Sequence, residues 1–165
     1  MKINWIRCRS YDEARDYSRV IYPHEWDGKP FYWGKAHTSF FGGHKRKQDG
    51  PEASGRYNAG YRHWIEGCLR PGGRLYIGKL DEEALRCVDE VENYLIHTCG
   101  HEMNSKVAAP TRQLQIEHEG DIPQSIASLY APALRTAIDE GDASGVAKGN
   151  VFARVREIIK LPPPR

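Results

Sequence analysis

The chain has 165 residues, of which 39% are hydrophobic and 28% charged, with a formal net charge of +2. This composition indicates one soluble globular domain with a substantial core, and the net charge is too small to indicate nucleic-acid binding by itself. No apolar run approaches the length of a membrane span and the first five residues lack the apolar region of a signal peptide, so we expect a cytoplasmic protein without a membrane partner.

The N-terminal segment predicts a strand followed by a short helix. Residues 2–9 alternate apolar and polar side chains, which is typical of a strand. Ser10 and Glu13 form the capping-box pattern that opens a helix, and we expect this helix over 11–17.

A hairpin is expected over residues 20–36. Two apolar runs flank an Asp-Gly dipeptide at 27–28, and Gly accepts the positive φ that a tight turn requires. The hairpin carries Tyr22 and Tyr32 ten residues apart, and Lys35 follows three residues later. Two phenols with a cation beside them would suit a site that handles phosphate.

The segment 37–55 is a Gly-rich loop with a basic cluster that includes Lys45, Arg46 and Lys47. One interpretation is a solvated surface loop. The other is a loop that contacts phosphates, because clustered basic side chains gain affinity for DNA by releasing counterions.

A helix over 57–69 and a strand over 74–80 are expected next. Apolar residues recur every fourth position in the first segment, and the second is rich in β-formers. The strand contains Tyr76-Ile77-Gly78, which we interpret as ordinary strand residues because they lie too far from Tyr22 to complete a tight hairpin.

Residues 81–97 predict a helix with acidic residues in its first turn, where the helix dipole favours them. Glu92 falls at the border of its buried face, so its carboxylate is either partnered or faces a cleft. After the helix, His97, Cys99 and His101 have the chemistry of zinc ligands but not a common zinc spacing. The alternative is a helix end with a Gly C-cap at Gly100.

The last third predicts a short strand and several helices. We expect the strand over 114–118, helices over 122–130, 133–140 and 146–160, and a break at Pro132. Because the sequence contains no internal repeat and no low-complexity linker, we expect one compact unit.

Two motifs resemble the GIY-YIG nuclease family. Val20-Ile21-Tyr22, followed by Tyr32-Trp33-Gly34-Lys35-Ala36, is similar to the opening hairpin of its excision-repair and restriction-endonuclease branches. Val91 to Ile96, and then Met103-Asn104-Ser105-Lys106, is similar to the family's Glu helix and the Asn after it. The first motif lacks the family's leading Gly. The resemblance covers residues 18–106.

The resemblance implies an α+β fold in which a small antiparallel sheet is flanked by helices. Residues 1–106 would form the nuclease core, and 107–165 a mainly helical C-terminal extension packed on it. The implied catalytic residues are Tyr22, Tyr32, Lys35, Arg56, Tyr61 and Glu92, and Asn104 would orient the region of Glu92. Together with the basic cluster Lys45, Arg46 and Lys47, Asn104 is expected among the substrate-binding residues.

The arginine position stays open. Arg56 and Tyr61 are five residues apart where the family has about one helical turn, so Arg62, His63 or Arg46 are alternatives to Arg56.

The activity implied is metal-dependent DNA endonuclease, either a type II restriction enzyme acting as a homodimer or a stand-alone repair or mobile-element nuclease. Glu92 would hold one divalent ion, Mg²⁺ or Mn²⁺, in each active site. Tyr22 would accept a proton from water, and Tyr32 would bond the nucleophile or the phosphate. The alternative is a non-catalytic DNA-binding module with this fold, or a subunit that needs a partner.

Overall fold

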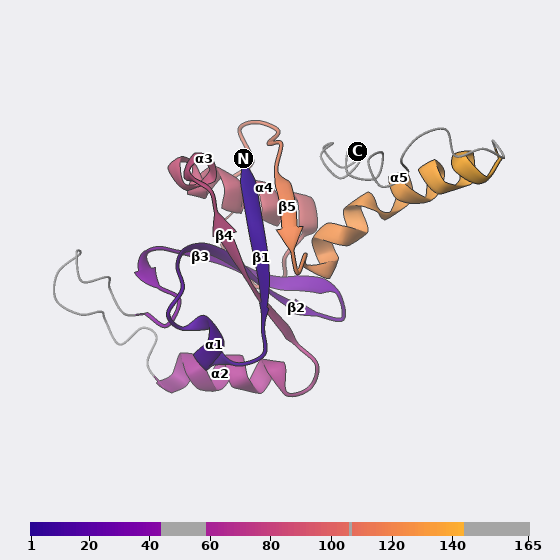
Figure 1. Ribbon diagram of the computed structural model, residues 1–165. Coiled ribbons are helices and arrows are strands. Elements are labelled where there is room, and N and C mark those ends of the chain that lie inside the picture. The colour runs from indigo at the N-terminus through magenta and orange to yellow at the C-terminus, as the bar shows by residue number, and fades with distance from the viewer. Residues whose placement is uncertain (44–58, 106, 144–165) are drawn as a thin grey trace.

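The computed structural model describes residues 1–43, 59–105 and 107–143, and these form a five-stranded sheet flanked by helices (Figure 1). The elements are β1 (Lys2–Cys8), α1 (Tyr11–Ala14), β2 (Ser18–Trp26), β3 (Lys29–Phe40), α2 (Ala59–Leu69), β4 (Arg74–Leu80), α3 (Glu82–Arg86), α4 (Val88–Cys99), β5 (Glu117–Gly120) and α5 (Gln124–Ala143). The strand order is β3-β2-β4-β1-β5, so β3 and β5 form the two edges.

The α+β class with helices around a sheet is confirmed, and the sheet is mixed, so the expected antiparallel sheet forms only its β3-β2-β4-β1 part. β1, β2, β3 and β4 pair antiparallel, but β5 pairs parallel with β1, with Lys2 opposite Glu117. The segment after residue 106 therefore contributes a strand to the central sheet in addition to packing against it. This strand covers 117–120 and not the expected 114–118, while Leu114 and Ile116 are buried in the core just before it.

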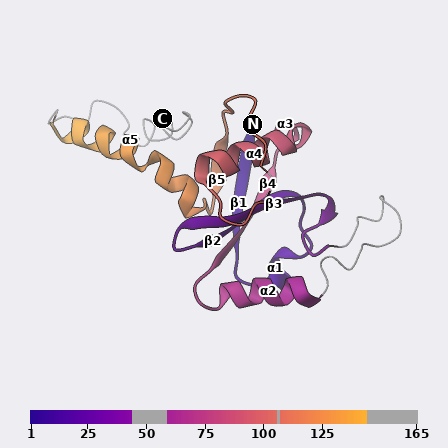
Figure 2. The same ribbon diagram turned by 180° about the vertical axis from the view of Figure 1, so that it is seen from behind.

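Helices cover both faces of the sheet and enclose two apolar clusters. On one face, α3, α4 and α5 pack over a cluster that contains Ile3, Trp5, Ile21, Trp33 and Tyr76. On the other face, α1 and α2 pack over a second cluster. The views from front and back show α1 and α2 on one side of the sheet and α3 and α4 on the other (Figures 1 and 2). Successive residues of a strand point to opposite faces of the sheet, so the position of a residue in this alternation decides on which face its side chain lies.

The central strands fit together because a glycine leaves room for an indole. Trp5 lies opposite Gly78 in the β1–β4 pair, and a Cβ at Gly78 would come within 2.6 Å of the Trp5 ring. Tyr76 lies in the core cluster of the same face. The prediction that Tyr76-Ile77-Gly78 is ordinary strand sequence is consistent with this packing, and the strand bounds 74–80 are confirmed.

The predicted hairpin is confirmed, with β2 and β3 joined by a turn at Asp27 and Gly28. Both turn residues have positive φ, 49° and 72°, which is the pattern of a type I′ turn. The N-cap at Ser10 is confirmed, while the second bond of the capping box goes to the residue before the N-cap. Ser10 Oγ accepts a hydrogen bond from the Glu13 amide, and Glu13 accepts one from the Arg9 amide.

Several helix bounds differ from the sequence predictions. The helix expected over 11–17 ends at Ala14, and the helix expected over 57–69 is described from Ala59. The helix expected over 81–97 is two helices, because the backbone at Cys87 leaves the helical conformation with φ −128° and ψ 38°. The Gly cap is confirmed: Gly100 has φ 87° and its amide donates to Ile96 O.

α5 continues through Pro132, where a break was expected. Proline removes one helical hydrogen bond, to the carbonyl of Ser128, and both residues are exposed, so water can reach that carbonyl. The helix expected over 146–160 lies outside the described residues. Among the described helices, none is long and apolar enough to cross a membrane.

The start of α5 is tied to the hairpin by Glu25 of β2. This carboxylate is fully buried and accepts hydrogen bonds from the amides of Gln124 and Ser125 at 3.1 and 2.8 Å. A carboxylate satisfies the free amides of a helix N-terminus and is favoured there by the helix dipole. The C-terminal segment is thereby attached to the same hairpin that carries the two tyrosines.

Candidate active site

The two hairpin tyrosines lie side by side on the face covered by α2. Tyr22 is opposite Gly34, and its ring centroid is 6.3 Å from that of Tyr32. Tyr22 is 2% exposed, whereas Tyr32 is half-buried. Tyr32 is therefore the phenol that a substrate can reach more easily, with Tyr22 packed behind it.

Lys35 and Glu92 form an ion pair on the opposite face of β3. The Lys35 ammonium also contacts Asp89 at 2.7 Å, so one cation lies between two carboxylates of α4. Glu92 is 15% exposed and Asp89 is 78% exposed. The prediction that Glu92 falls at the border of the buried face is confirmed.

The two carboxylates determine the charge of Lys35. Burial lowers the pKa of the Lys35 ammonium, but the hydrogen bonds that it donates to Asp89 and Glu92 outweigh burial and raise the pKa above its ordinary value. The side chain is therefore cationic throughout the physiological range, and Glu92 has a positive charge beside it.

Strand alternation separates these two pairs. Tyr32 and Lys35 are three residues apart on one strand, an odd number, so their side chains point to opposite faces. Tyr22 and Tyr32 pack with the α2-side cluster, whereas Trp33, which shares the parity of Lys35, belongs to the α4-side cluster. The arrangement differs from the expected group of two phenols with Lys35 beside them. Because β3 is an edge strand, a substrate could reach both pairs only by passing around that edge.

Asn104 closes the outer edge of β3. Its side-chain oxygen accepts from the Trp33 amide at 2.9 Å, and its side-chain nitrogen donates to the Trp33 carbonyl at 2.7 Å. It takes the place of a neighbouring strand at the residue between Tyr32 and Gly34. The side chain thus orients the strand that carries the site, and it does so on β3 and not near Glu92, where it was expected to act.

The arginine position and the basic loop lie mostly outside the described residues. This holds for Arg56, Lys45, Arg46 and Lys47. Tyr61 falls within α2, but the structure does not describe its side chain.

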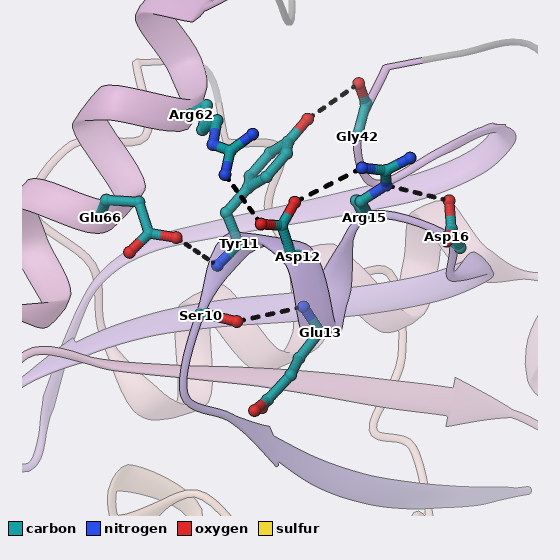
Figure 3. A network of polar contacts seen from close by, with 9 residues as sticks. All are labelled: Ser10, Tyr11, Asp12, Glu13, Arg15, Asp16, Gly42, Arg62 and Glu66. Carbon is teal, nitrogen blue, oxygen red and sulfur yellow. Dashed lines mark hydrogen bonds and ion pairs between the residues drawn. The ribbon is translucent and has the colours of Figure 1, made fainter.

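Arg62, an alternative arginine, is engaged with α1 (Figure 3). It pairs with Asp12 at 2.8 Å, and its guanidinium lies 5.6 Å from the centre of the Tyr11 ring. Figure 3 also shows Glu66 of the same helix accepting from the Tyr11 amide and the Tyr11 hydroxyl donating to Gly42 O. These contacts explain how α1 and α2 are held together and give Arg62 a structural role. His63, the other alternative in α2, is exposed.

Sequence reasoning missed an aromatic group around the tyrosines, formed by His24, Phe31, Phe41 and Trp64. The His24 ring lies 5.8 and 5.9 Å from the rings of Tyr22 and Tyr32, and 5.0 Å from that of Trp64. Burial lowers the pKa of His24 to about 3, so its imidazole is neutral. Its parity with Tyr22 could have placed it on this face from sequence alone.

The donor set beside Lys35 suits a hard divalent cation. Mg²⁺ commonly binds through one or two carboxylates and keeps several waters, and Asp89 and Glu92 supply two carboxylates that one ammonium already bridges. Within the described ranges, no group of three or more His, Cys, Asp or Glu side chains could hold a metal by itself. Any ion bound here would have to share or displace the contacts of Lys35 and rely on water or substrate oxygens.

Comparisons with models of protein families, with curated proteins and with solved structures gave no match to this chain.

Proposed function

We propose that this protein is a metal-dependent endonuclease that hydrolyses phosphodiester bonds of DNA at the edge of β3. The observation that carries the proposal is that β3 holds a half-buried phenol, Tyr32, and a cation, Lys35, and that Lys35 is bound to Glu92 from 57 residues further along the chain. These are the hairpin and helix residues for which the resemblance to the GIY-YIG family implies catalytic roles.

Each residue has a distinct part in the chemistry. Lys35 would neutralise charge on the phosphate oxygens, which is favoured by a cation with a raised pKa in a partly buried site. Tyr32 would bond the attacking water or the phosphate. The new P–O bond forms from water as the P–O bond to the sugar breaks. The proton of that water would pass to a tyrosine in its phenolate form, and solvent water would give a proton to the departing oxygen.

Glu92 and Asp89 are the residues that would hold the metal ion. A bound Mg²⁺ supplies charge stabilisation on the phosphate and on the leaving oxygen. Lys35 shares both carboxylates, so metal binding and the position of Lys35 should be coupled.

The test is cleavage of supercoiled plasmid with Mg²⁺ or Mn²⁺, with and without a chelator. Wild type should convert the plasmid to nicked or linear DNA only in the presence of metal, and Glu92→Ala should not. Discrete bands would in addition indicate sequence specificity.

The matched control is Glu90→Ala on the same helix. Glu90 pairs with Arg112 on the surface, so the substitution removes a carboxylate outside the proposed site. It should leave cleavage unchanged. Cleavage by Glu92→Ala at the wild-type rate would contradict the proposal, and salt-sensitive DNA binding without any cleavage would favour a non-catalytic DNA-binding module.

A further inference from the structure

A cavity of about 380 Å³ lies beside the hairpin turn, on the α2 side. Its walls are aromatic and apolar, and three charged side chains line it as well. The residues that matter here are Trp26, Phe31, Trp64, Met103, Asp27, Lys29 and Glu102. The volume falls within the range of small-molecule sites.

Two of the wall residues are unusually exposed. Trp26 is 44% exposed and Met103 is 58% exposed, and within the described part of the chain these are the large hydrophobic side chains that remain open to water. They come from distant segments, the end of β2 and the segment after α4, and meet at this cavity. An exposed apolar surface rimmed by charges is typical of a binding site.

A β-bulge builds the inner wall. His24 pairs with Tyr32 and Glu25 pairs with Pro30, so Phe31 is one extra residue on β3. Bulges re-aim side chains, and here the Phe31 ring lies 6.0 Å from the Trp64 ring on the α2 face, at an interplanar angle of 83°.

The residue at the bulge, Phe31, also positions the opposite wall of the cavity, which is the segment after α4. The Phe31 carbonyl accepts hydrogen bonds from the amides of both Glu102 and Met103, at 3.1 and 2.8 Å. The segment after α4 is thereby fixed at the mouth of the cavity.

The lining favours one chemical class of ligand. Aromatic walls bind flat π-systems by stacking. Asp27 and Glu102 disfavour an anion, and Lys29 disfavours a cation, so the lining suits a neutral ring that carries both donors and acceptors at its edge. We propose that this cavity binds a single unstacked nucleobase.

The cavity is connected to the tyrosine pair through Trp64. Trp64 contacts the Tyr32 ring edge-on, with centroids 6.4 Å apart, and also lines the cavity. A base held in the cavity would therefore have its phosphate close to Tyr32. This step rests on the proposed function, and it names the substrate class as nucleic acid with an unpaired nucleotide next to the cleaved bond.

Tryptophan fluorescence tests binding without cleavage. Trp5 and Trp33 are 1% and 0% exposed, so quenching by added DNA reports mainly on Trp26 and Trp64. The probes are a short single-stranded oligonucleotide and a blunt duplex of the same length, added to Glu92→Ala protein in a chelator. We expect the single strand to quench, and Met103→Ala and Lys29→Ala to weaken its binding about 5- to 100-fold. Lys2→Ala, which removes an exposed lysine of β1 that pairs with Glu119, is the control and should bind like the parent.

Cleavage assays separate failure of the cavity from failure of the nuclease. Quenching that Met103→Ala and Lys29→Ala reduce would support the cavity even if no cleavage is found. Equal binding of single strand and duplex, with no effect of either variant, would overturn it. So would wild-type cleavage of blunt duplexes as fast as of duplexes with one unpaired base, and that result would leave the nuclease proposal standing.

Discussion

Gly34 lies opposite Tyr22 in the hairpin, and the absence of a side chain at this position leaves the space that the Tyr22 ring occupies. A Cβ at Gly34 would lie 2.6 Å from the phenol carbon and oxygen of Tyr22. The glycine of the Tyr-x-Gly-Lys motif therefore has a packing reason in this chain, independent of any resemblance.

Gly34→Ala should destabilise the protein by about 1–3 kcal/mol, because the added methyl group forces a buried ring to move. Gly67→Ala is the matched control. Gly67 is exposed in α2 and a Cβ there meets nothing within 4 Å, so this substitution should stabilise by about 1 kcal/mol or less. Urea unfolding measures both. Equal stability of wild type and Gly34→Ala would mean that Tyr22 is not held as described.

Two buried histidines make stability depend on pH. Burial lowers the pKa of His24 to about 3 and that of His118 to about 4. His118 Nδ1 also accepts a hydrogen bond from Trp5 Nε1 at 3.0 Å, which requires the neutral ring. Between these values and the ordinary histidine pKa of about 6.5, the unfolded chain binds more protons than the folded one, so stability falls as pH falls.

We expect each histidine to cost about 2 kcal/mol of stability at pH 5 relative to pH 7.5. His24→Phe should remove its share of this difference, since the neighbouring side chains are aromatic. His101→Phe, at an exposed position, should leave the difference intact. Urea unfolding at the two pH values provides the comparison. A His24→Phe protein with the full wild-type pH dependence would show that His24 is not held neutral.

At the scale of elements, β3 is the strand on which the proposed site depends. It is an edge strand, and unpaired edges expose backbone groups. The chain covers this edge with the segment after α4, where Glu102 and Met103 donate to Phe31 O and Asn104 bonds both backbone groups of Trp33. α4 and the segment after it are thus connected to the hairpin at two places, through Lys35–Glu92 and through Asn104–Trp33.

Asn104→Ala should destabilise the protein by about 1–3 kcal/mol, since two partly buried backbone groups lose their partner. Amide exchange at Trp33 should become faster. Ser105→Ala, one residue away and exposed, should change neither quantity. If Trp33 exchange were the same in Asn104→Ala and wild type, the edge of β3 would have some other cover.

At the scale of the whole molecule, local patterns predicted the elements well where one pattern was strong. The Asp-Gly turn predicted the hairpin, and β-formers predicted β4. β5 is four residues long and pairs with β1 across more than a hundred residues, and no local pattern encodes such a pairing. The same holds for the bulge at Phe31 and for Glu25 as the cap of α5.

The sequence motifs name the residues of the candidate site but do not predict how these residues contact one another. The hairpin and helix motifs indicated Tyr22, Tyr32, Lys35 and Glu92, and the structure brings together Tyr22 with Tyr32 and Lys35 with Glu92. Their division between two faces follows from the odd spacing of Tyr32 and Lys35 on one strand. Lys35 meets Glu92 because α4 packs against β3, and no local sequence pattern predicts that packing.

The central claim is that phosphodiester hydrolysis uses both faces of β3, and single-turnover cleavage with a parallel measurement of DNA affinity tests it most directly. Tyr32→Phe and Glu92→Ala should each slow cleavage about 100-fold or more while DNA affinity stays within about 3-fold of wild type. Tyr17→Phe, which removes a phenol at the far end of the hairpin, should cleave normally. Cleavage by either Tyr32→Phe or Glu92→Ala at the wild-type rate would contradict the claim that the two faces form one site.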